Sequence, residues 1–173
     1  MNDFVDSRVT FIDFDTATFA PGTGLVVGGT TRTENVDARL WGFEAEAAYD
    51  AGPWFASLSG MIPRGENRSG GPLGSIPQDR LNLGLGWRPA PGVTLGARGT
   101  FARGQSRVPE GGQESDGFSV VDLFASYAPE SGPLAGAVFR AGVDNLFDRD
   151  HRIHPNGLDQ PGRSFKISAA FTF

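Results

Sequence analysis

The chain has 173 residues, of which 39% are hydrophobic and 20% charged, a balance too apolar for a disordered segment and too polar for a helical membrane protein. A net charge of −5 argues against generic nucleic-acid binding, so we expect no nucleic-acid partner. No run of about 18 apolar residues is present, which excludes a transmembrane helix, and no cysteine, which excludes a disulfide framework and a thiolate metal site. The 25 glycines and 14 phenylalanines fit a protein of strands and turns.

The first 37 residues carry the weakest pattern. A first strand is predicted near residues 4–14, although its charged residues do not all fall on one face. Residues 15–37 are rich in glycine, threonine and polar residues and are interpreted as a long linker. Within it, Gly22-Thr23-Gly24-Leu25-Val26-Val27-Gly28 is one residue away from a dinucleotide-binding fingerprint. Because this stretch neither follows a clear strand nor opens a helix, it is interpreted as a loop.

Seven segments after residue 37 alternate apolar and polar residues, the pattern of a β-strand with one apolar face. In the clearest, 80–88, arginine, asparagine and glycine alternate with Leu81, Leu83, Leu85 and Trp87. The other six predicted strands are 39–49, 54–62, 93–103, 118–127, 137–147 and 164–173. A soluble β-sandwich shows the same periodicity, so this pattern alone does not establish a membrane protein.

The connections between the predicted strands alternate in length. Long polar loops are predicted at 15–37, 64–79, 104–117 and 148–163, and short turns at 50–53, 89–92 and 129–133. Outer-membrane barrels keep this alternation, with short turns on the periplasmic side and long loops outside the cell. Such barrels also place aromatic rings at strand ends, and the predicted strand ends hold Trp41, Tyr49, Trp54, Trp87 and Tyr127. The sequence therefore predicts an all-β fold, an antiparallel transmembrane β-barrel segment of about eight strands.

The end of the chain carries the most specific motif. Val143-Asp144-Asn145-Leu146-Phe147-Asp148, Gln160-Pro161-Gly162-Arg163 and the terminal Phe173 resemble the C-terminal signature of TonB-dependent outer-membrane receptors. Two upstream stretches, 42–49 and 76–85, resemble further blocks of this family in the same order. The resemblance implies that residues 1–173 form the C-terminal part of a receptor barrel. The plug domain, the coupling box and the N-terminal barrel strands of such a receptor, and a secretory signal, are not found in this sequence.

The resemblance also implies a function. Members of the family lie in the cell outer membrane and take up iron-containing ligands such as haem or ferric siderophores. Their implied partners are outer-membrane lipid, a TonB-type energy-coupling protein that acts through the missing plug, and the barrel-assembly machinery, which binds the C-terminal strand. The stretch 122–127 followed by 143–148 is most similar to haem and haemoglobin receptors. The alternatives are a free-standing small eight-stranded outer-membrane barrel with a structural or adhesive role and a small lumen-site enzyme.

Two histidines are the candidate ligand-binding residues. His151 and His154 have an i, i+3 spacing that could present two imidazoles to a metal or to haem iron. The favoured alternative is that both are solvated loop residues. Glu44 and Glu46 share a strand face and are predicted to meet lumen arginines, among them Arg80, Arg98 and Arg140. No Ser/His/Asp set and no phosphate-binding loop are present, so we expect no catalytic residue, no resident metal and no cofactor.

Overall fold

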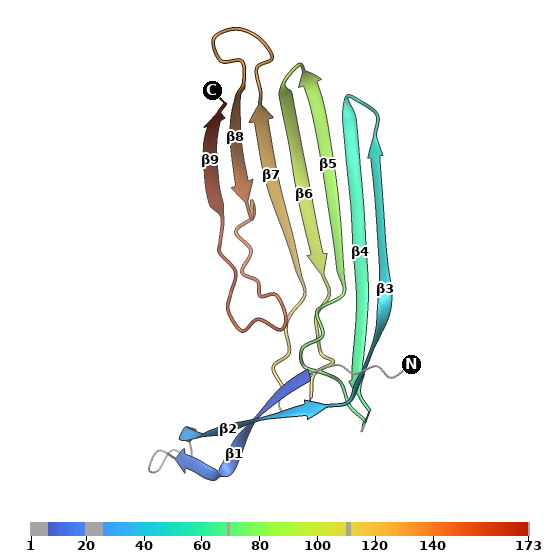
Figure 1. Ribbon diagram of the computed structural model, residues 1–173, viewed down its shortest axis with the longest axis vertical. Coiled ribbons are helices and arrows are strands. Elements are labelled where there is room, and N and C mark those ends of the chain that lie inside the picture. Colours follow the sequence, from blue (N-terminus) through green and yellow to red (C-terminus); the bar gives the residue numbers. More distant parts are fainter. Residues whose placement is uncertain (1–6, 20–25, 69, 110–111, 173) are drawn as a thin grey trace.

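The computed structural model describes residues 7–19, 26–68, 70–109 and 112–172, with side chains from residue 37 onward. Nine strands make up this part of the chain (Figure 1). They are β1 (Ser7–Phe19), β2 (Val26–Val36), β3 (Ala38–Asp50), β4 (Trp54–Asn67), β5 (Arg80–Ala90), β6 (Val93–Ala102), β7 (Phe118–Tyr127), β8 (Ala137–Asp144) and β9 (Ser164–Phe171). No helix in these ranges is long and apolar enough to cross a membrane.

Strands β3 to β9 form one antiparallel sheet in which each strand pairs with its neighbours in sequence. The predicted antiparallel all-β fold is confirmed, with nine strands in place of about eight. The prediction of a long linker at 15–37 is wrong, because β1 and β2 pair as a separate two-stranded sheet. The glycines of this stretch dominated the prediction, although the valines and threonines of β2 are residues that favour strands.

Short turns and long loops alternate between β3 and β9, as predicted. Residues 51–53, 91–92 and 128–136 connect strands at one end of the sheet, which we call the short-turn end. The β4–β5, β6–β7 and β8–β9 loops lie at the opposite, long-loop end. Gly52 and Gly92 have φ angles of 82° and 73°, a backbone conformation that other residues rarely adopt. These glycines allow the chain to reverse within two or three residues.

The sheet has an apolar face and a polar face, because the register aligns the alternating residues of all seven strands. On the apolar face, Leu85 of β5 lies opposite Ala56 of β4 and Ala97 of β6. Large side chains on this face are strongly exposed, including Leu85 at 53% and Ile167 at 89%. An exposed apolar surface of this extent is typical of a membrane or protein contact rather than of a surface in water.

Aromatic rings line the apolar face near the short-turn end. Trp54 and Trp87 stack with ring centroids 5.3 Å apart and an interplanar angle of 11°. Phe139 lies 6.4 Å from the ring of Tyr127 and 6.0 Å from that of Phe171. The row follows neighbouring strands, as an aromatic girdle at a membrane interface does.

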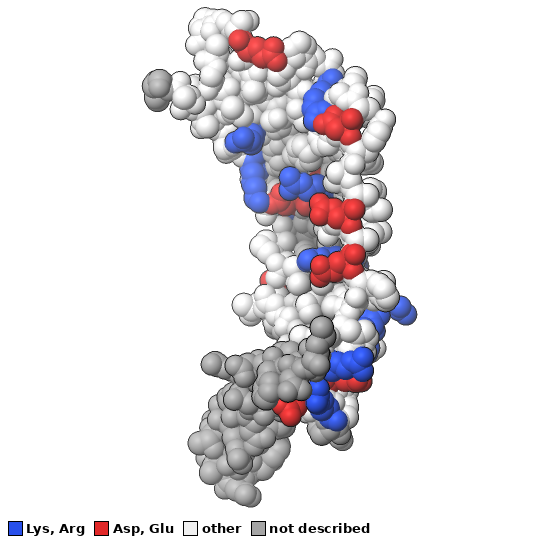
Figure 2. Space-filling model, turned by 45° about the vertical axis from the view of Figure 1, so that its right-hand side comes forward, with Lys and Arg blue, Asp and Glu red and all other residues white. Residues whose placement is uncertain are grey.

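The polar face carries a row of small hydrogen-bonding side chains across three strands. Asn82 donates to the hydroxyl of Ser59 at 3.2 Å and accepts from that of Thr100 at 3.3 Å. Acidic and basic side chains are interleaved along the molecule instead of forming one patch (Figure 2). The polar face is therefore hydrophilic without a strong charge of one sign.

The predicted pairing of Glu44 and Glu46 with lumen arginines is wrong. Among the residues with described side chains, neither glutamate forms an ion pair with Arg80, Arg98 or Arg140. Glu44 lies opposite Met61, and Arg80 lies one strand further on, where its guanidinium reaches the sulfur of Met61 at 3.9 Å. The glutamates and the arginines lie on the same face of the sheet, but the strand register keeps their charged groups apart.

Two phenylalanines lie flat on the polar face above glycines. A Cβ atom at Gly86 would lie 1.9 Å from the ring of Phe55, and one at Gly96 would lie 2.2 Å from the ring of Phe124. The guanidinium of Arg88 sits 4.5 Å from the centroid of Phe55. Gly86 and Gly96 are therefore positions on the polar face over which aromatic rings lie.

The seven-stranded sheet is open, since β3 and β9 each have a single neighbour in it. Unpaired strand edges are not tolerated in lipid. The two edge strands therefore have to be paired or covered before the sheet can span a bilayer.

Candidate functional site in the long loops

The three long loops are held together by buried polar side chains. Gln105, which is 1% exposed, pairs through its backbone with Ser115 across the β6–β7 loop. Its side-chain amide donates to the carbonyl oxygens of Ile76 and Pro77 in the β4–β5 loop, at 3.0 and 3.2 Å. Buried polar groups are stable only when hydrogen-bonded, so these contacts fix the two loops relative to each other.

His154 ties the β8–β9 loop to both of the others. Its side chain is 5% exposed, with Nε2 lying 2.8 Å from the carbonyl oxygen of Gly74 and Nδ1 lying 3.1 Å from the hydroxyl of Ser115. A carbonyl only accepts, so Nε2 carries the proton and Nδ1 accepts from the serine. The backbone N–H of His154 also donates to Gln78. This buried position differs from the solvated loop histidine that the sequence favoured.

His151 has a different environment. Its ring is half-buried, with a centroid 4.5 Å from that of Phe118, and Nδ1 lies 3.0 Å from the carbonyl oxygen of Arg149. Within the described part of the chain, Nε2 of His151 has no hydrogen-bond partner. The i, i+3 spacing does not bring the two imidazoles to one ligand, because His154 is engaged through both nitrogens. The predicted role of these histidines in ligand binding stays a prediction.

Asn145 organises the chain where β8 ends. It has a φ of 50° and is 3% exposed, and its backbone N–H donates to the carboxylate of Asp122 at 2.8 Å. Its side-chain oxygen accepts from the N–H of Arg149, and its amide donates to the carbonyl oxygens of Arg149 and Pro161. Asparagine tolerates a positive φ better than most residues, so this residue type suits both the backbone and the contacts.

The two halves of the predicted signature lie side by side. The carboxylate of Asp148, itself at a φ of 54°, accepts from the N–H of Arg163 at 2.7 Å and lies where a side chain at Gly162 would clash. The backbone N–H of Gln160 donates to His151. The backbone N–H of Leu146 donates to a carbonyl oxygen of β7, which extends the pairing between β7 and β8. The side chain of Phe147 is 72% exposed. Phe173, the last residue of the signature, lies outside the described residues.

An arginine cluster, consisting of Arg64, Arg103 and Arg107 around Asp79, lies where the sheet meets the long loops. Arg64 holds Asp79 through two hydrogen bonds of 2.5 and 3.1 Å, and Arg107 lies 3.4 Å from the same carboxylate. The hydrogen bond from Arg64 lowers the pKa of Asp79, and the charges of Arg107 and Arg103 act in the same direction against the opposing effect of burial. Asp79 therefore stays ionised at neutral pH.

Sequence reasoning singled out Asn145 and His154 but did not identify Gln105 or Ser115, which are also buried polar residues of this region. The upstream family block 76–85 contains Gln78 and Asp79, which the structure places in the loop contacts and in the arginine cluster. Gln105 and Ser115 lie in a polar stretch where nothing distinguishes them from their exposed neighbours. Their burial depends on loops that are distant in sequence.

The chain matches known proteins along most of its length. A model of the family described as TonB dependent receptor-like, beta-barrel matches residues 2–146. The hemin receptor of Yersinia enterocolitica is 30% identical over 98% of the chain, and the heme/hemopexin utilization protein C of Haemophilus influenzae is 28% identical over all of it. The chain spans only 24% and 25% of the lengths of these two relatives.

Solved structures agree with this assignment. The copper transporter OprC superposes with a TM-score of 0.75 at 29% identity, over 84% of this chain and 25% of OprC. The FrpB iron transporter from Neisseria meningitidis (F5-1 variant) superposes with a TM-score of 0.65 at 19% identity, over 79% of this chain and 24% of FrpB. The family match, the relatives and the two-faced antiparallel sheet together show that this chain belongs to the TonB-dependent receptor β-barrel family.

Proposed function

We propose that this chain supplies the C-terminal strands of a TonB-dependent receptor barrel in the outer membrane, and that this receptor takes up haem. The observation that carries the proposal is the likeness to hemin and heme/hemopexin receptors along the whole chain. The two-faced sheet supports it, since an apolar face in contact with lipid and a polar face toward the lumen are what a barrel strand requires. The family consists of receptors for transport, so we expect no enzymatic activity.

The open edges favour this proposal over a free-standing eight-stranded barrel. The relatives are about four times as long as this chain, which leaves ample sequence for further strands beside β3 and β9. In such a receptor a plug would fill the lumen and contact the energy-coupling protein. The barrel-assembly machinery would bind β9.

Of the two candidate histidines, His151 is the better placed to bind haem iron. Its Nδ1 faces the carbonyl oxygen of Arg149, which can only accept, so Nδ1 carries the proton and Nε2 keeps its lone pair. A histidine ligand commonly has this arrangement, with one nitrogen donating to a carbonyl group and the other facing the metal. His154 would first have to break two hydrogen bonds. We therefore expect His151 to act in ligand capture and His154 to hold the loops in place.

Growth and spectroscopy test the proposal together. A strain that lacks its own haem receptors should grow on haemin as sole iron source when it expresses the receptor that contains this chain. The purified receptor should shift the Soret band of added haemin saturably. We expect His151→Ala to weaken this binding at least tenfold, while Arg163→Ala, a change in the same loop, leaves it within twofold. Growth on a ferric siderophore or uptake of copper without any haem shift would refute the haem assignment and leave the family assignment intact.

A further inference from the structure

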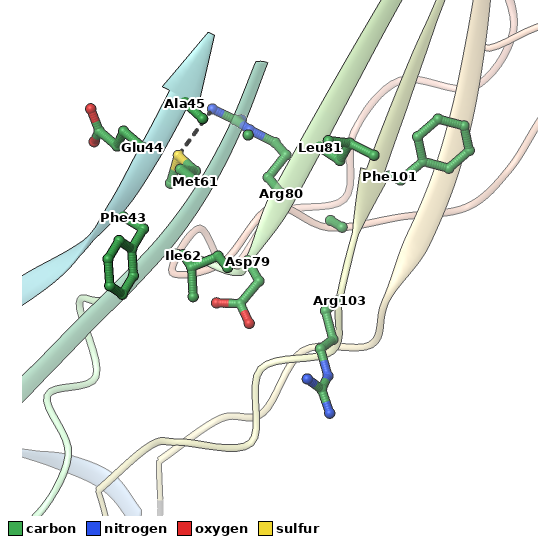
Figure 3. A pocket seen from close by; sticks show the side chains of 12 residues that line it. Phe43, Glu44, Ala45, Met61, Ile62, Asp79, Arg80, Leu81, Phe101 and Arg103 are labelled. Atoms are coloured by element: carbon green, nitrogen blue, oxygen red, sulfur yellow. Dashed lines mark hydrogen bonds between the residues drawn. The ribbon is translucent and has the colours of Figure 1, made fainter. Parts of the chain in front are cut away.

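A groove crosses the apolar face of β3, β4, β5 and β6 near the long-loop end. Its volume is about 490 Å³, and its lining is almost entirely apolar. Ala45 and Gly60, which lie opposite each other in register, form its floor. The side chains around this floor are Phe43, Ile62, Leu81 and Phe101 (Figure 3).

The groove exists because its floor lacks side chains that the fold has room to hold. A Cβ atom at Gly60 would meet the side chain of Leu81 at 3.4 Å, an ordinary van der Waals distance. In the next row toward the short-turn end, Leu58 occupies the position that corresponds to Gly60, and Leu83 lies opposite it. Glycine at position 60 therefore leaves space on the apolar face without being required by the backbone.

Positive charge accumulates at the long-loop end of the groove. Asp79 and Arg103 line this end (Figure 3). With Arg64 and Arg107, the arginine cluster contributes three guanidinium groups against one carboxylate. Arg39 and Glu66, the next charged residues on this face, lie opposite each other and offset each other's charge. The cluster thus keeps a positive excess.

Arg103 is the cluster member available to a ligand. Its side chain is exposed and makes no hydrogen bond or ion pair with any described residue, whereas Arg64 is committed to Asp79 by two hydrogen bonds. Its backbone N–H donates to the carbonyl oxygen of Asp79, which fixes the start of the side chain beside the groove. Arg107, at 3.4 Å from the carboxylate, keeps donors free for a second contact.

We propose that the groove and the arginine cluster form one binding site for a phosphorylated, acylated lipid of the outer leaflet, such as lipid A. An acyl chain lies over Ala45 and Gly60, and a phosphate group is bound by Arg103 and Arg107. Guanidinium groups form paired hydrogen bonds with phosphate oxygens, which accounts for arginine rather than lysine here. Acyl chains are already in apolar surroundings in a bilayer, so the groove supplies shape and the arginines supply most of the selectivity.

This inference rests on the proposed placement in an outer membrane. The test uses the receptor that contains this chain, purified from outer membranes in a mild detergent and titrated with lipid A while native mass spectrometry counts bound lipids. We expect Arg103→Gln with Arg107→Gln, and separately Gly60→Leu, to weaken lipid A binding at least tenfold. Arg103→Lys should retain part of the affinity. Recovery of the receptor in the inner membrane or cytosol would refute the membrane placement before any lipid is measured.

Matched controls separate the site from general lipid association. Arg163→Gln removes an exposed arginine from another loop, and Ala97→Leu enlarges a side chain on the same apolar face outside the groove. Both should bind lipid A within twofold of the unchanged receptor, and all variants should keep the heat-modifiable gel mobility of a folded barrel. Phosphatidylcholine and inorganic phosphate should not compete. Equal lipid A binding by all folded variants, or competition by inorganic phosphate alone, would overturn the proposal.

Discussion

Replacement of Leu83 by arginine tests which face of the sheet meets lipid. Leu83 lies on the apolar face of β5, opposite Leu58 of β4, and is 37% exposed. The apolar band on this strand extends from Leu81 to Trp87, a distance of about 20 Å at about 3.4 Å per residue. Leu83 is thus close to the middle of the bilayer in the proposed barrel.

The expected cost follows from the position of the charge. An arginine on the lipid face near the midplane destabilises an outer-membrane barrel by about 2 to 4 kcal/mol. Asn82→Arg is the matched control, because Asn82 lies on the polar face and its replacement loses only two long hydrogen bonds, to the half-buried hydroxyls of Ser59 and Thr100. That loss amounts to about 1 kcal/mol. The two variants should therefore differ by about 1 to 3 kcal/mol, or about 5- to 150-fold in the folding equilibrium constant.

Urea titration of the receptor in phospholipid vesicles measures this difference. Folding is followed by tryptophan fluorescence and by protection from protease, and the Leu83→Arg variant should unfold at the lower urea concentration. If Leu83→Arg and Asn82→Arg proved equally stable, the apolar face would not be in contact with lipid. The membrane assignment of this sheet would then fail.

Asp79→Asn should destabilise the receptor by about 1 kcal/mol at pH 7, because Asp79 is held by Arg64 and Arg107. The folded-state pKa of Asp79 is lowered, so the stability difference between the two proteins should persist above the ordinary pKa of 3.8 and disappear as the pH falls below it. Urea midpoints measured from pH 3 to pH 7 test this dependence. Asn145→Ala should lower the free energy of unfolding by about 2 to 4 kcal/mol, and by more than Asn145→Gly does. Both variants lose the side-chain hydrogen bonds, but only alanine is strained at a φ of 50°. Equal urea midpoints for the two variants would remove the backbone argument. Cysteines introduced at Ser106 and Asn156 should react with an impermeant maleimide on intact cells, whereas one at Ser131 should not. The reverse labelling pattern would invert the topology.

The β3–β9 sheet was predictable because its strands alternate cleanly. In β5, four large apolar residues fall on one face, and the turns that flank such strands contain glycine and proline. The β1–β2 hairpin was missed because its glycines indicated a loop, while strand formation there depends on pairing between two weakly patterned segments. The local residue pattern thus predicted the strands that keep one apolar face and one polar face along their whole length.

The candidate site was less predictable, because its contacts join distant parts of the chain. The motif that ends β8 could be recognised, but the reason for Asn145 lies in Asp122 and Pro161, which are 23 and 16 residues away. His154 carries no local sign of burial. Glu44 and Glu46 form no ion pair with any residue whose side chain is described, and this outcome depended on register, which alternation alone does not fix between neighbouring strands.

The sequence distance across the loop contacts has a consequence for folding order. His154 bonds to Gln78 and Gly74, which precede it by 76 and 80 residues, while the strand pairs of the sheet join neighbouring segments. Contacts between residues so far apart in sequence form late, after the local hairpins have ordered most of the chain and so reduced the entropy cost of closing the long loop. Docking of the β8–β9 loop therefore completes the folding of this region. It can occur only when the hairpins before it have paired in the correct register, so a misregistered sheet remains open at its long-loop end and accessible to proteases.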